Sequence, residues 1–116
     1  MKFRVFDKRY HKYLPKHTID NMILYALNSN DYIIELATGL RDSQGNDIYI
    51  GDIVYYERDD EYFLIGYDDK IGAIDICNGG VCYTFEHILS EDLEVSGNIN
   101  EDKELLKWVN QFMKKH

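Results

Sequence analysis

Downstream of residue 52 the chain consists of short β-rich runs separated by tight turns. Four runs are rich in Val, Ile, Tyr and Phe, the residues that favour strands: IVYYE, YFLIGY, IGAIDIC and VCYTF. The segments RDDE, DDK and NGG between them are acidic or glycine-containing turns. Short strands with such turns are typical of a small barrel or sandwich. We therefore expect a mainly β fold of the α+β class, with a small SH3-like β-barrel core.

Two turns punctuate the stretch ATGLRDSQGNDIYIGDIV, which begins at residue 37. The segment DSQG places Asp42 at the first position of a type I turn and Gly45 where the chain enters the left-handed region. We expect Gly45 to have a positive φ and Asp42 to accept hydrogen bonds from the backbone N–H groups that follow it. Gly51 and Asp52 form a second tight turn, in which Asp52 is expected to act in the same way.

Two functional interpretations of these turns fail on spacing. A phosphate-binding Walker loop ends in Gly-Lys-Ser/Thr, and the chain holds no Gly-Lys pair. An EF-hand calcium loop needs glycine at its sixth position and glutamate at its twelfth, whereas Gly45 is fourth from Asp42 and Ile53 is twelfth. The turns are therefore expected to serve folding and not chemistry.

The remaining segments extend this core at both ends. We expect one domain with an N-terminal basic strand and a hairpin or helix over 1–36, the barrel-like core over 37–99, and a C-terminal helix over 100–115. Residues 19–27 fit a helical stripe, but a hairpin between 22–27 and 32–36 fits the pattern equally well.

The expected C-terminal helix has an apolar stripe at helical spacing. Its members are Leu105, Trp108, Val109 and Phe112. Either Asn98 or Asn100 can cap its first turn. Such a helix more often covers the domain's own core, or a subunit interface, than a ligand.

The stretch that holds the two turns resembles the signature of the YopX-like family of bacteriophage and prophage proteins. KFRVFDK (2–8) and EVSGNINEDKELL (94–106) are similar to the family's opening and closing blocks, with Phe6 in place of the usual tryptophan and Lys103 in place of a common proline. The resemblance favours the hairpin over residues 19–36, and it brings no established catalytic chemistry. The motif residues are Thr38, Gly39, Leu40, Asp42, Gly45, Ile48, Tyr49, Gly51, Asp52, Gly97 and Asn98.

Charge is distributed unevenly along the 116 residues, whose net charge is −8. Residues 1–20 carry net +4, so the rest of the chain carries −12. An acidic body argues against phosphate-backbone binding across the whole surface. The basic arm either docks on the acidic body of its own or a neighbouring subunit, which we favour, or contacts nucleic acid. The candidate contacts in the second case are Lys2, Arg4, Lys8, Arg9, Tyr10 and Lys12.

Candidate catalytic chemistry is sparse. Cys77 and Cys82 face each other across a hairpin that turns at Gly79 and Gly80, and two reduced, packing thiols are the expected state in a cytosolic protein. A zinc site needs more ligands than these cysteines and His87 supply. The four histidines have no local nucleophile pattern. We expect no catalytic, cofactor-binding or metal-binding residues.

These observations lead to two functional hypotheses. The first is a non-enzymatic phage accessory protein, a homo-oligomeric adaptor that binds host or phage proteins in the bacterial cytoplasm. The second is a role with nucleic acid, either binding through the basic arm or acidic DNA mimicry against a host protein. The N-terminus has no signal-peptide pattern and no apolar run is long enough to span a bilayer, so no membrane partner is expected.

Overall fold

The computed structural model describes residues 2–16, 18–19, 28–85 and 88–115, with only the backbone described for 110–115. It confirms a mainly β fold with a C-terminal helix, α2, at Lys103–Lys115. The strands in the described part of the chain are β1 (Phe3–Asp7), β2 (Lys12–Tyr13), β3 (Tyr32–Arg41), β4 (Asp47–Tyr49), β5 (Asp52–Tyr56), β6 (Glu61–Asp68), β7 (Ala73–Asn78), β8 (Val81–Thr84) and β9 (Leu93–Asn98). Two short 3-10 helices are η1 (Glu57–Asp59) and η2 (Ser90–Asp92).

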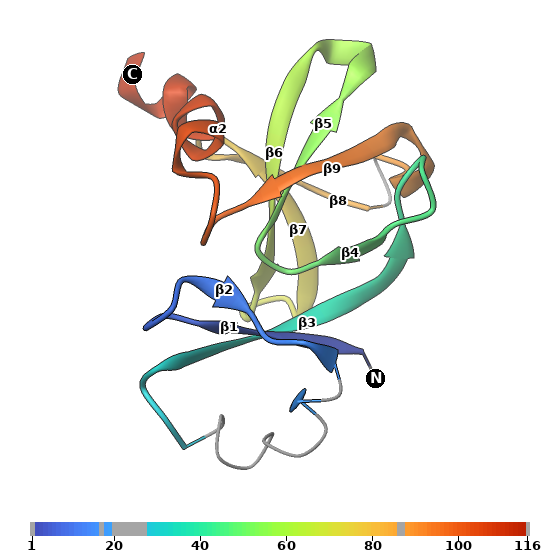
Figure 1. Cartoon of the computed structure of the whole chain (residues 1–116). Coiled ribbons are helices and arrows are strands. Elements are labelled where there is room, and N and C mark those ends of the chain that lie inside the picture. Colours follow the sequence, from blue (N-terminus) through green and yellow to red (C-terminus); the bar gives the residue numbers. More distant parts are fainter. Residues whose placement is uncertain (1, 17, 20–27, 86–87, 116) are drawn as a thin grey trace.

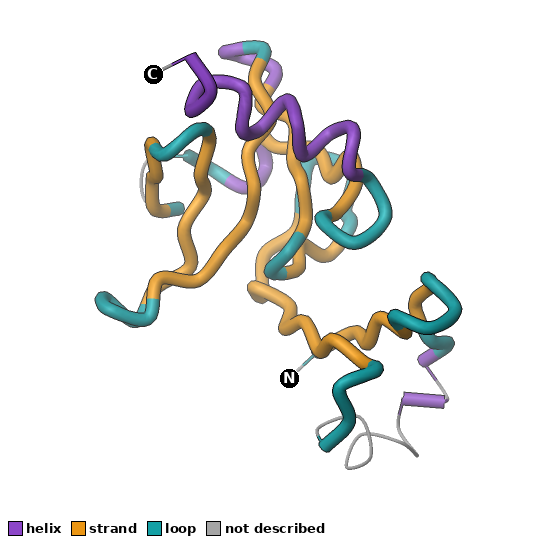
Figure 2. Tube along the Cα trace, turned by 90° about the vertical axis from the view of Figure 1, so that its left-hand side faces the viewer, coloured by secondary structure: helices purple, strands orange, loops and turns teal. Residues whose placement is uncertain are grey.

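The strands form two antiparallel sheets (Figure 1). One sheet has the order β2-β1-β3-β4, and the other, which curves into a half-barrel, has the order β8-β7-β6-β5-β9. Helix α2 packs against β6, β7 and β9. Figure 2 shows the β1–β3 end of the first sheet as a lobe below the half-barrel, with α2 across the top.

Strand β3 is shared by both parts of the molecule. Its first half, residues 32–36, pairs with β1, and its second half pairs with β4 through Ala37 and Arg41. The expected boundary between residues 36 and 37 therefore falls inside one continuous strand. The alternatives for residues 19–27, a helix or a hairpin with 32–36, lie largely outside the described residues.

Two apolar clusters fill the interior. The larger one lies inside the half-barrel and consists of Ile48, Val54, Tyr56, Phe63, Ile65, Ile76, Ile88 and Leu93. The smaller one lies under the N-terminal strands and consists of Val5, Ile19 and Tyr32. Motif residue Ile48 is fully buried in the larger cluster, because the short strand β4 alternates and turns this one side chain inward.

The turn at Asp42 has the expected conformation. Gly45 has φ +81°, and Asp42 Oδ1 accepts hydrogen bonds from the N–H groups of Gln44 (3.0 Å) and Asn46 (2.8 Å). The other carboxylate oxygen, Oδ2, accepts from the N–H of Val95 at 2.8 Å. Asp42 thus shapes its own turn and also fastens the turn to β9, which local spacing could not reveal.

The Gly45 turn leads to a stability prediction. We expect Gly45→Val to lower the melting temperature by several degrees, because a β-branched residue at this φ costs about 1–2 kcal/mol. The measurement is thermal unfolding followed by circular dichroism.

The matched control for this variant is Asp69→Ala, at an exposed turn position. Asp60, at the tip between β5 and β6, would be a poorer control, since it has φ +52° itself and accepts a 2.6 Å hydrogen bond from Tyr55. That bond raises the pKa of Tyr55 to about 12. Equal melting temperatures for Gly45→Val and wild type would contradict the prediction.

Asp42 also provides a pH-dependent prediction. Burial alone would raise the pKa of Asp42, but the N–H groups of Val95 and Asn46 outweigh it and bring the pKa below its ordinary value. A lowered carboxyl pKa gives stability that is present above pH 4 and is lost as the pH falls through the folded-state pKa. We expect Asp42→Asn to lower the free energy of unfolding by about 1.5–3 kcal/mol at pH 7, a difference that shrinks steadily below pH 4.

Urea unfolding at a series of pH values measures this difference. Asp42→Asn retains an oxygen for the turn and loses the charge that the Val95 N–H contacts, so it is a conservative probe. A difference from wild type that stays constant down to pH 2 would show that the charge of Asp42 is unimportant.

The expectation of two reduced cysteines is wrong. Cys77 and Cys82 are directly paired across the β7–β8 hairpin, their Cα atoms lie 4.1 Å apart, and a disulfide joins them. The turn between them is formed by Gly79 (φ +59°) and Gly80 (φ +93°), as the sequence predicted. Asn78 and Val81 are the pair beside this two-residue turn, and Cys77 and Cys82 are the pair after it. That second pair does not exchange backbone hydrogen bonds, so its side chains lie close enough for a disulfide.

Helix α2 differs from its predicted stripe. Val109 is buried and Leu105 is half-buried, but Trp108 is 60% exposed, and the side chain of Phe112 lies outside the description. Asp102 is the residue directly before the helix, and its carbonyl accepts the first helical N–H, that of Leu106. Asn98 instead accepts from the N–H groups of Asn100 and Glu101, so it shapes the approach to the helix and does not cap it.

Candidate functional site

A buried ionic cluster joins the N-terminal sheet to the half-barrel. Arg4 of β1 donates from Nε to Glu35 of β3 at 2.9 Å and from a terminal nitrogen to Asp52 of β5 at 2.6 Å. The guanidinium carbon lies 4.6 Å from the ring centroids of both Tyr13 and Tyr49, so two aromatic rings enclose the charge. The cation of Arg4 is thus shared between two carboxylates and two rings, and these four groups come from four other strands.

Further hydrogen bonds satisfy the carboxylates of this cluster. The Tyr13 hydroxyl donates to Glu35 at 2.8 Å, and the Asn100 amide donates to both Tyr13 and Glu35. The Tyr49 N–H donates to Asp52 at 2.7 Å. Asp52 thus accepts a backbone hydrogen bond at its turn, as expected, but from a residue that precedes it and not from one that follows. Asp52 is 1% exposed, which explains why its carboxylate needs so many partners.

Burial and charge shift the pKa values of the cluster in opposite directions. Burial alone would lower the pKa of Arg4, but the carboxylates of Asp52 and Glu35 raise it above its usual value. Burial raises the pKa of Asp52, and the Tyr49 N–H and Arg4 act against that rise. Burial also raises the pKa of the Tyr13 hydroxyl. Both carboxylates and the Tyr13 hydroxyl have protein partners, as do two guanidinium nitrogens of Arg4, so the cluster is suited to holding segments together.

A groove with apolar walls lies between the two sheets. It encloses about 630 Å³. Its walls come from 33–37 of β3, from Ile50 and Gly51, from 64–67 of β6, and from Ile74 and Ile99. Glu35 is the one charged residue in this lining, and its carboxylate is bound by Arg4. Sequence reasoning did not find this groove, because its walls are far apart along the chain; a charge inside the apolar run YIIEL was the available signal.

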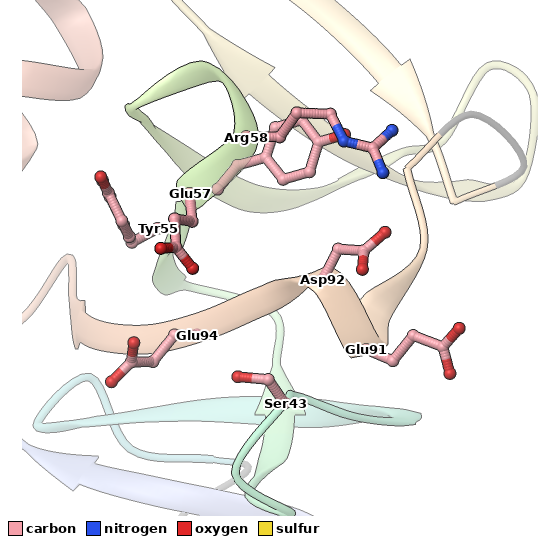
Figure 3. A pocket seen from close by; sticks show the side chains of 8 residues that line it. Ser43, Tyr55, Glu57, Arg58, Glu91, Asp92 and Glu94 are labelled. Atoms are coloured by element: carbon pink, nitrogen blue, oxygen red, sulfur yellow. The ribbon is translucent and has the colours of Figure 1, made fainter.

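A second hollow, of about 400 Å³, lies beside β5 and β9 and is acidic. Figure 3 shows that its carboxylates point in different directions and do not converge on one point. The lining residues are Ser43, Tyr55, Tyr56, Glu57, Arg58, Glu91, Asp92 and Glu94. The group of possible metal ligands that the described residues bring together lies elsewhere, at Asp75, Cys77 and Cys82. Its two sulfur atoms are bonded to each other and are not available as thiolate ligands.

The comparisons with known proteins bear on the whole chain. A family model described as YopX protein matches residues 2–107. The chain belongs to the YopX family. A crystal structure of protein EF1440 from Enterococcus faecalis superposes with a TM-score of 0.63 and 23% identity, over 90% of this chain and 96% of that one. At this identity the likeness shows a shared fold. No curated protein matches.

The motif of this YopX-family chain serves the fold at each place described so far. Gly45 and Asp42 make a turn, Ile48 fills the core, and Tyr49 and Asp52 hold Arg4. Thr38 belongs to the same group, since its hydroxyl donates to the Ile48 carbonyl at 2.9 Å. Among the described residues Asp42 and Asp52 do not share a ligand set; each is bound by separate backbone or side-chain donors.

The candidate nucleic-acid contacts of the YopX-family chain are divided between internal and exposed positions. Arg4 is internal, Lys2 pairs with Asp47 at 3.1 Å, and Arg9 donates to the Tyr32 hydroxyl at 2.7 Å. Lys8 and Tyr10 lie exposed in the turn between β1 and β2, and Lys12 lies exposed at the start of β2. Lys2, Arg4 and Arg9 thus form ion pairs within the chain, whereas docking of the whole arm remains a prediction.

The histidines show no catalytic arrangement in the described residues. His11 has φ +54° and packs edge-on against Phe6, with ring centroids 5.2 Å apart. His17, His87 and His116 lie outside the described residues. No helix in the described part of the YopX-family chain is long and apolar enough to cross a membrane.

Proposed function

We propose that this YopX-family chain is a non-enzymatic phage accessory protein that acts as a protein-binding adaptor in the bacterial cytoplasm. The observation that supports this function is the groove between β3 and β6. Its walls are apolar and its one carboxylate is bound internally, in a chain whose net charge is −8. Concave apolar surfaces with few polar groups are where proteins most often bind their ligands.

The surroundings of the groove support a protein ligand in particular. Leu36 is 41% exposed and Tyr67 is 56% exposed, and both line the groove. Exposed aliphatic and aromatic side chains around an apolar depression are typical of protein interfaces. The ionisable residues that meet in the buried cluster are bound to one another, which is consistent with a module that binds and does not catalyse.

A selection with displayed random peptides tests this function. Peptides selected on the wild-type protein should bind Leu36→Glu about tenfold more weakly or worse, because the new carboxylate enters the apolar groove. The matched control is Leu40→Glu, which places the same charge on an exposed position of the same strand outside the groove lining. Equal binding to both variants would remove the groove as the binding site.

Self-association is the second part of the proposal. The homo-oligomer expected from the sequence is consistent with the exposed indole of Trp108 on α2. Sedimentation equilibrium of the wild type and Trp108→Ala measures it, and a monomeric wild type would remove it.

A nucleic-acid role is the second candidate. It is favoured by the exposed β1–β2 turn, where Tyr10 is 70% exposed and its ring lies near both Arg9 and Lys12. An aromatic ring between cations is suited to stacking on an unpaired base. Binding to single-stranded DNA or RNA should weaken steeply with salt and with Tyr10→Ala and Lys12→Glu. In the mimicry form, the acidic surface would instead displace a host protein from DNA, and a competition assay tests it.

A further inference from the structure

The β3 wall of the groove is the unpaired edge of a strand. Ala37 donates its N–H to the Lys2 carbonyl on the β1 side, whereas the Leu36 carbonyl accepts from the Ile50 N–H on the opposite side. Successive residues of a strand direct their backbone groups to alternate sides. The backbone groups of Ile34, two residues before Leu36, therefore point to the same side as those of Leu36, into the groove.

The neighbouring strands confirm this direction for Ile34. Its partner on β1 is Val5, and the Val5 carbonyl accepts a hydrogen bond from Leu14, on the side away from β3. Val5 and Ile34 are thus a pair that does not exchange hydrogen bonds. Among the described residues, the N–H and C=O of Ile34 have no partner on the groove side.

The β6 wall is a second unpaired edge. The Ile65 carbonyl accepts from the Gly51 N–H at 2.8 Å, on the side where β5 lies. Tyr67 lies two residues further along and points its backbone groups to that same side, but the ladder between β5 and β6 reaches only to Leu64. In the part of the chain that the structure describes, no backbone group is bonded to Tyr67 there.

The link between these edges shows what fits between them. Ile50 donates to Leu36 of β3, and the next residue, Gly51, donates to Ile65 of β6. Ile50 and Gly51 form a turn, with Gly51 at φ +102°, yet their consecutive N–H groups bond to the two different edges. A single backbone segment therefore bridges β3 and β6 at this end, and in the described residues the positions beyond it, at Ile34 and Tyr67, are open.

We propose that the groove binds an extended peptide segment of a partner protein, which inserts between β3 and β6 and hydrogen-bonds to both edges. This inference rests on the proposed protein-binding function and specifies its ligand. From the Ile50–Gly51 link towards the open positions, residue numbers fall along β3 from Leu36 to Ile34 and rise along β6 from Ile65 to Tyr67. The two strands that form the edges therefore run in opposite directions. The inserted segment pairs in parallel with one strand and antiparallel with the other, and joins the two sheets.

The geometry argues against strand β3 of a second protein molecule as the segment that fills the groove. A strand that inserts here needs both of its edges free, but β3 already uses one edge for β1. The occupant is therefore a segment with no sheet of its own, such as a loop or a tail. Its side chains alternate between the two faces of the joined sheet, so apolar residues are required at every second position, on the face that meets the apolar lining of the groove.

Charge defines one end of the segment. Tyr67 is followed by Asp68 and Asp69, and Asp75 lies beside Gly66 in the groove wall. Burial, and then the charge of Asp68, raise the pKa of Asp75. The carboxylates of Asp68 and Asp69 lie at or near the surface and make this end of the groove electrically negative. A lysine or arginine at the end of the peptide nearest Tyr67 therefore favours binding, and a glutamate there disfavours it.

Backbone N-methylation of the selected peptides tests the insertion. A segment between two edges donates successive N–H groups to β3 and β6 in turn, so N-methylation at either of two consecutive central positions should weaken binding about tenfold. Binding to one edge alone would be sensitive at only one of the two positions. A Lys→Glu change at the Tyr67 end should also weaken binding, and the effect should diminish in high salt.

Amide hydrogen exchange of the protein provides the second measurement. With saturating peptide, the Ile34 and Tyr67 amides should exchange about tenfold more slowly, while the amide of Cys82 on the outer strand β8 should not change. Unprotected Ile34 and Tyr67 amides, or binding that is indifferent to N-methylation, would overturn strand insertion while the adaptor function stands. Sensitivity at alternate positions only would also overturn insertion between two edges. If every selected peptide binds Leu36→Glu as tightly as the wild-type protein, both the adaptor function and this inference are wrong.

Discussion

Arg4→Met is expected to lower the free energy of unfolding by about 3–5 kcal/mol, because it leaves the buried carboxylates of Glu35 and Asp52 without their shared cation. Methionine retains much of the length of the side chain, so the two tyrosine rings keep a packing partner and the loss reports mainly the charge. Chemical denaturation followed by circular dichroism measures the change.

The matched control for Arg4→Met is Arg41→Met. Arg41 also faces a carboxylate, that of Asp47 at 3.6 Å, but its side chain is 67% exposed and surface pairs contribute little. A second feature separates the two variants. In Arg4→Met the unpaired carboxyl groups should take up protons more readily, so its deficit should shrink as the pH falls below about 5. A deficit under 1 kcal/mol at pH 7 would show that water replaces the guanidinium at no great cost.

Gly51→Ala adds only one methyl group, yet we expect it to destabilise the fold strongly. Gly51 has φ +102°, and a Cβ built there overlaps the carboxylate of Glu35. Strain in the backbone and displacement of Glu35 from Arg4 should together cost about 2–4 kcal/mol. The melting temperature should fall accordingly, and ring-current shifts of Tyr13 and Tyr49 in the NMR spectrum should change as the cluster rearranges.

Gly39→Ala separates the two contributions. Gly39 has a similar φ of +86°, but a Cβ at that position meets no atom within 4 Å. It therefore measures the backbone strain alone, and the difference between the two variants measures the collision with Glu35. If both variants lose the same stability, Glu35 moves aside freely and the cluster is less rigid than its hydrogen bonds suggest.

Strands and turns were predictable here because their signals are local. The pairing of Cys77 with Cys82 and the positive φ of Gly45 both follow from a few adjacent residues. The strand partner of residues 32–36 was not predictable in the same way, since an apolar run such as YIIEL fits more than one neighbour. Trp108 was predicted to lie on the apolar stripe of the helix but is exposed, for a related reason. Helical spacing identifies an apolar stripe but does not show how much of that stripe is covered by the rest of the domain.

The candidate site was less accessible to sequence reasoning than the fold. Asp52 was recognised as a turn residue, and its bond to the Tyr49 N–H lies three residues away. Its ion pair with Arg4 joins residues 48 positions apart, and no local pattern specifies such a contact. The groove forms where two strand edges meet in space. In the sequence these edges are two separate apolar runs, and nothing local indicates that they lie side by side.

The position of β9 has a consequence for how the protein is made. This strand follows the other described strands in the sequence, yet it pairs with β5, from which β6, β7 and β8 separate it. Until it emerges from the ribosome, a nascent chain exposes one edge of β5 and leaves Asp42 without its Val95 partner. Open hydrophobic edges of this kind recruit other unfinished chains. The sheet is therefore completed only after β9 has been translated, and chains terminated before residue 93 should be removed by proteases or accumulate as aggregates.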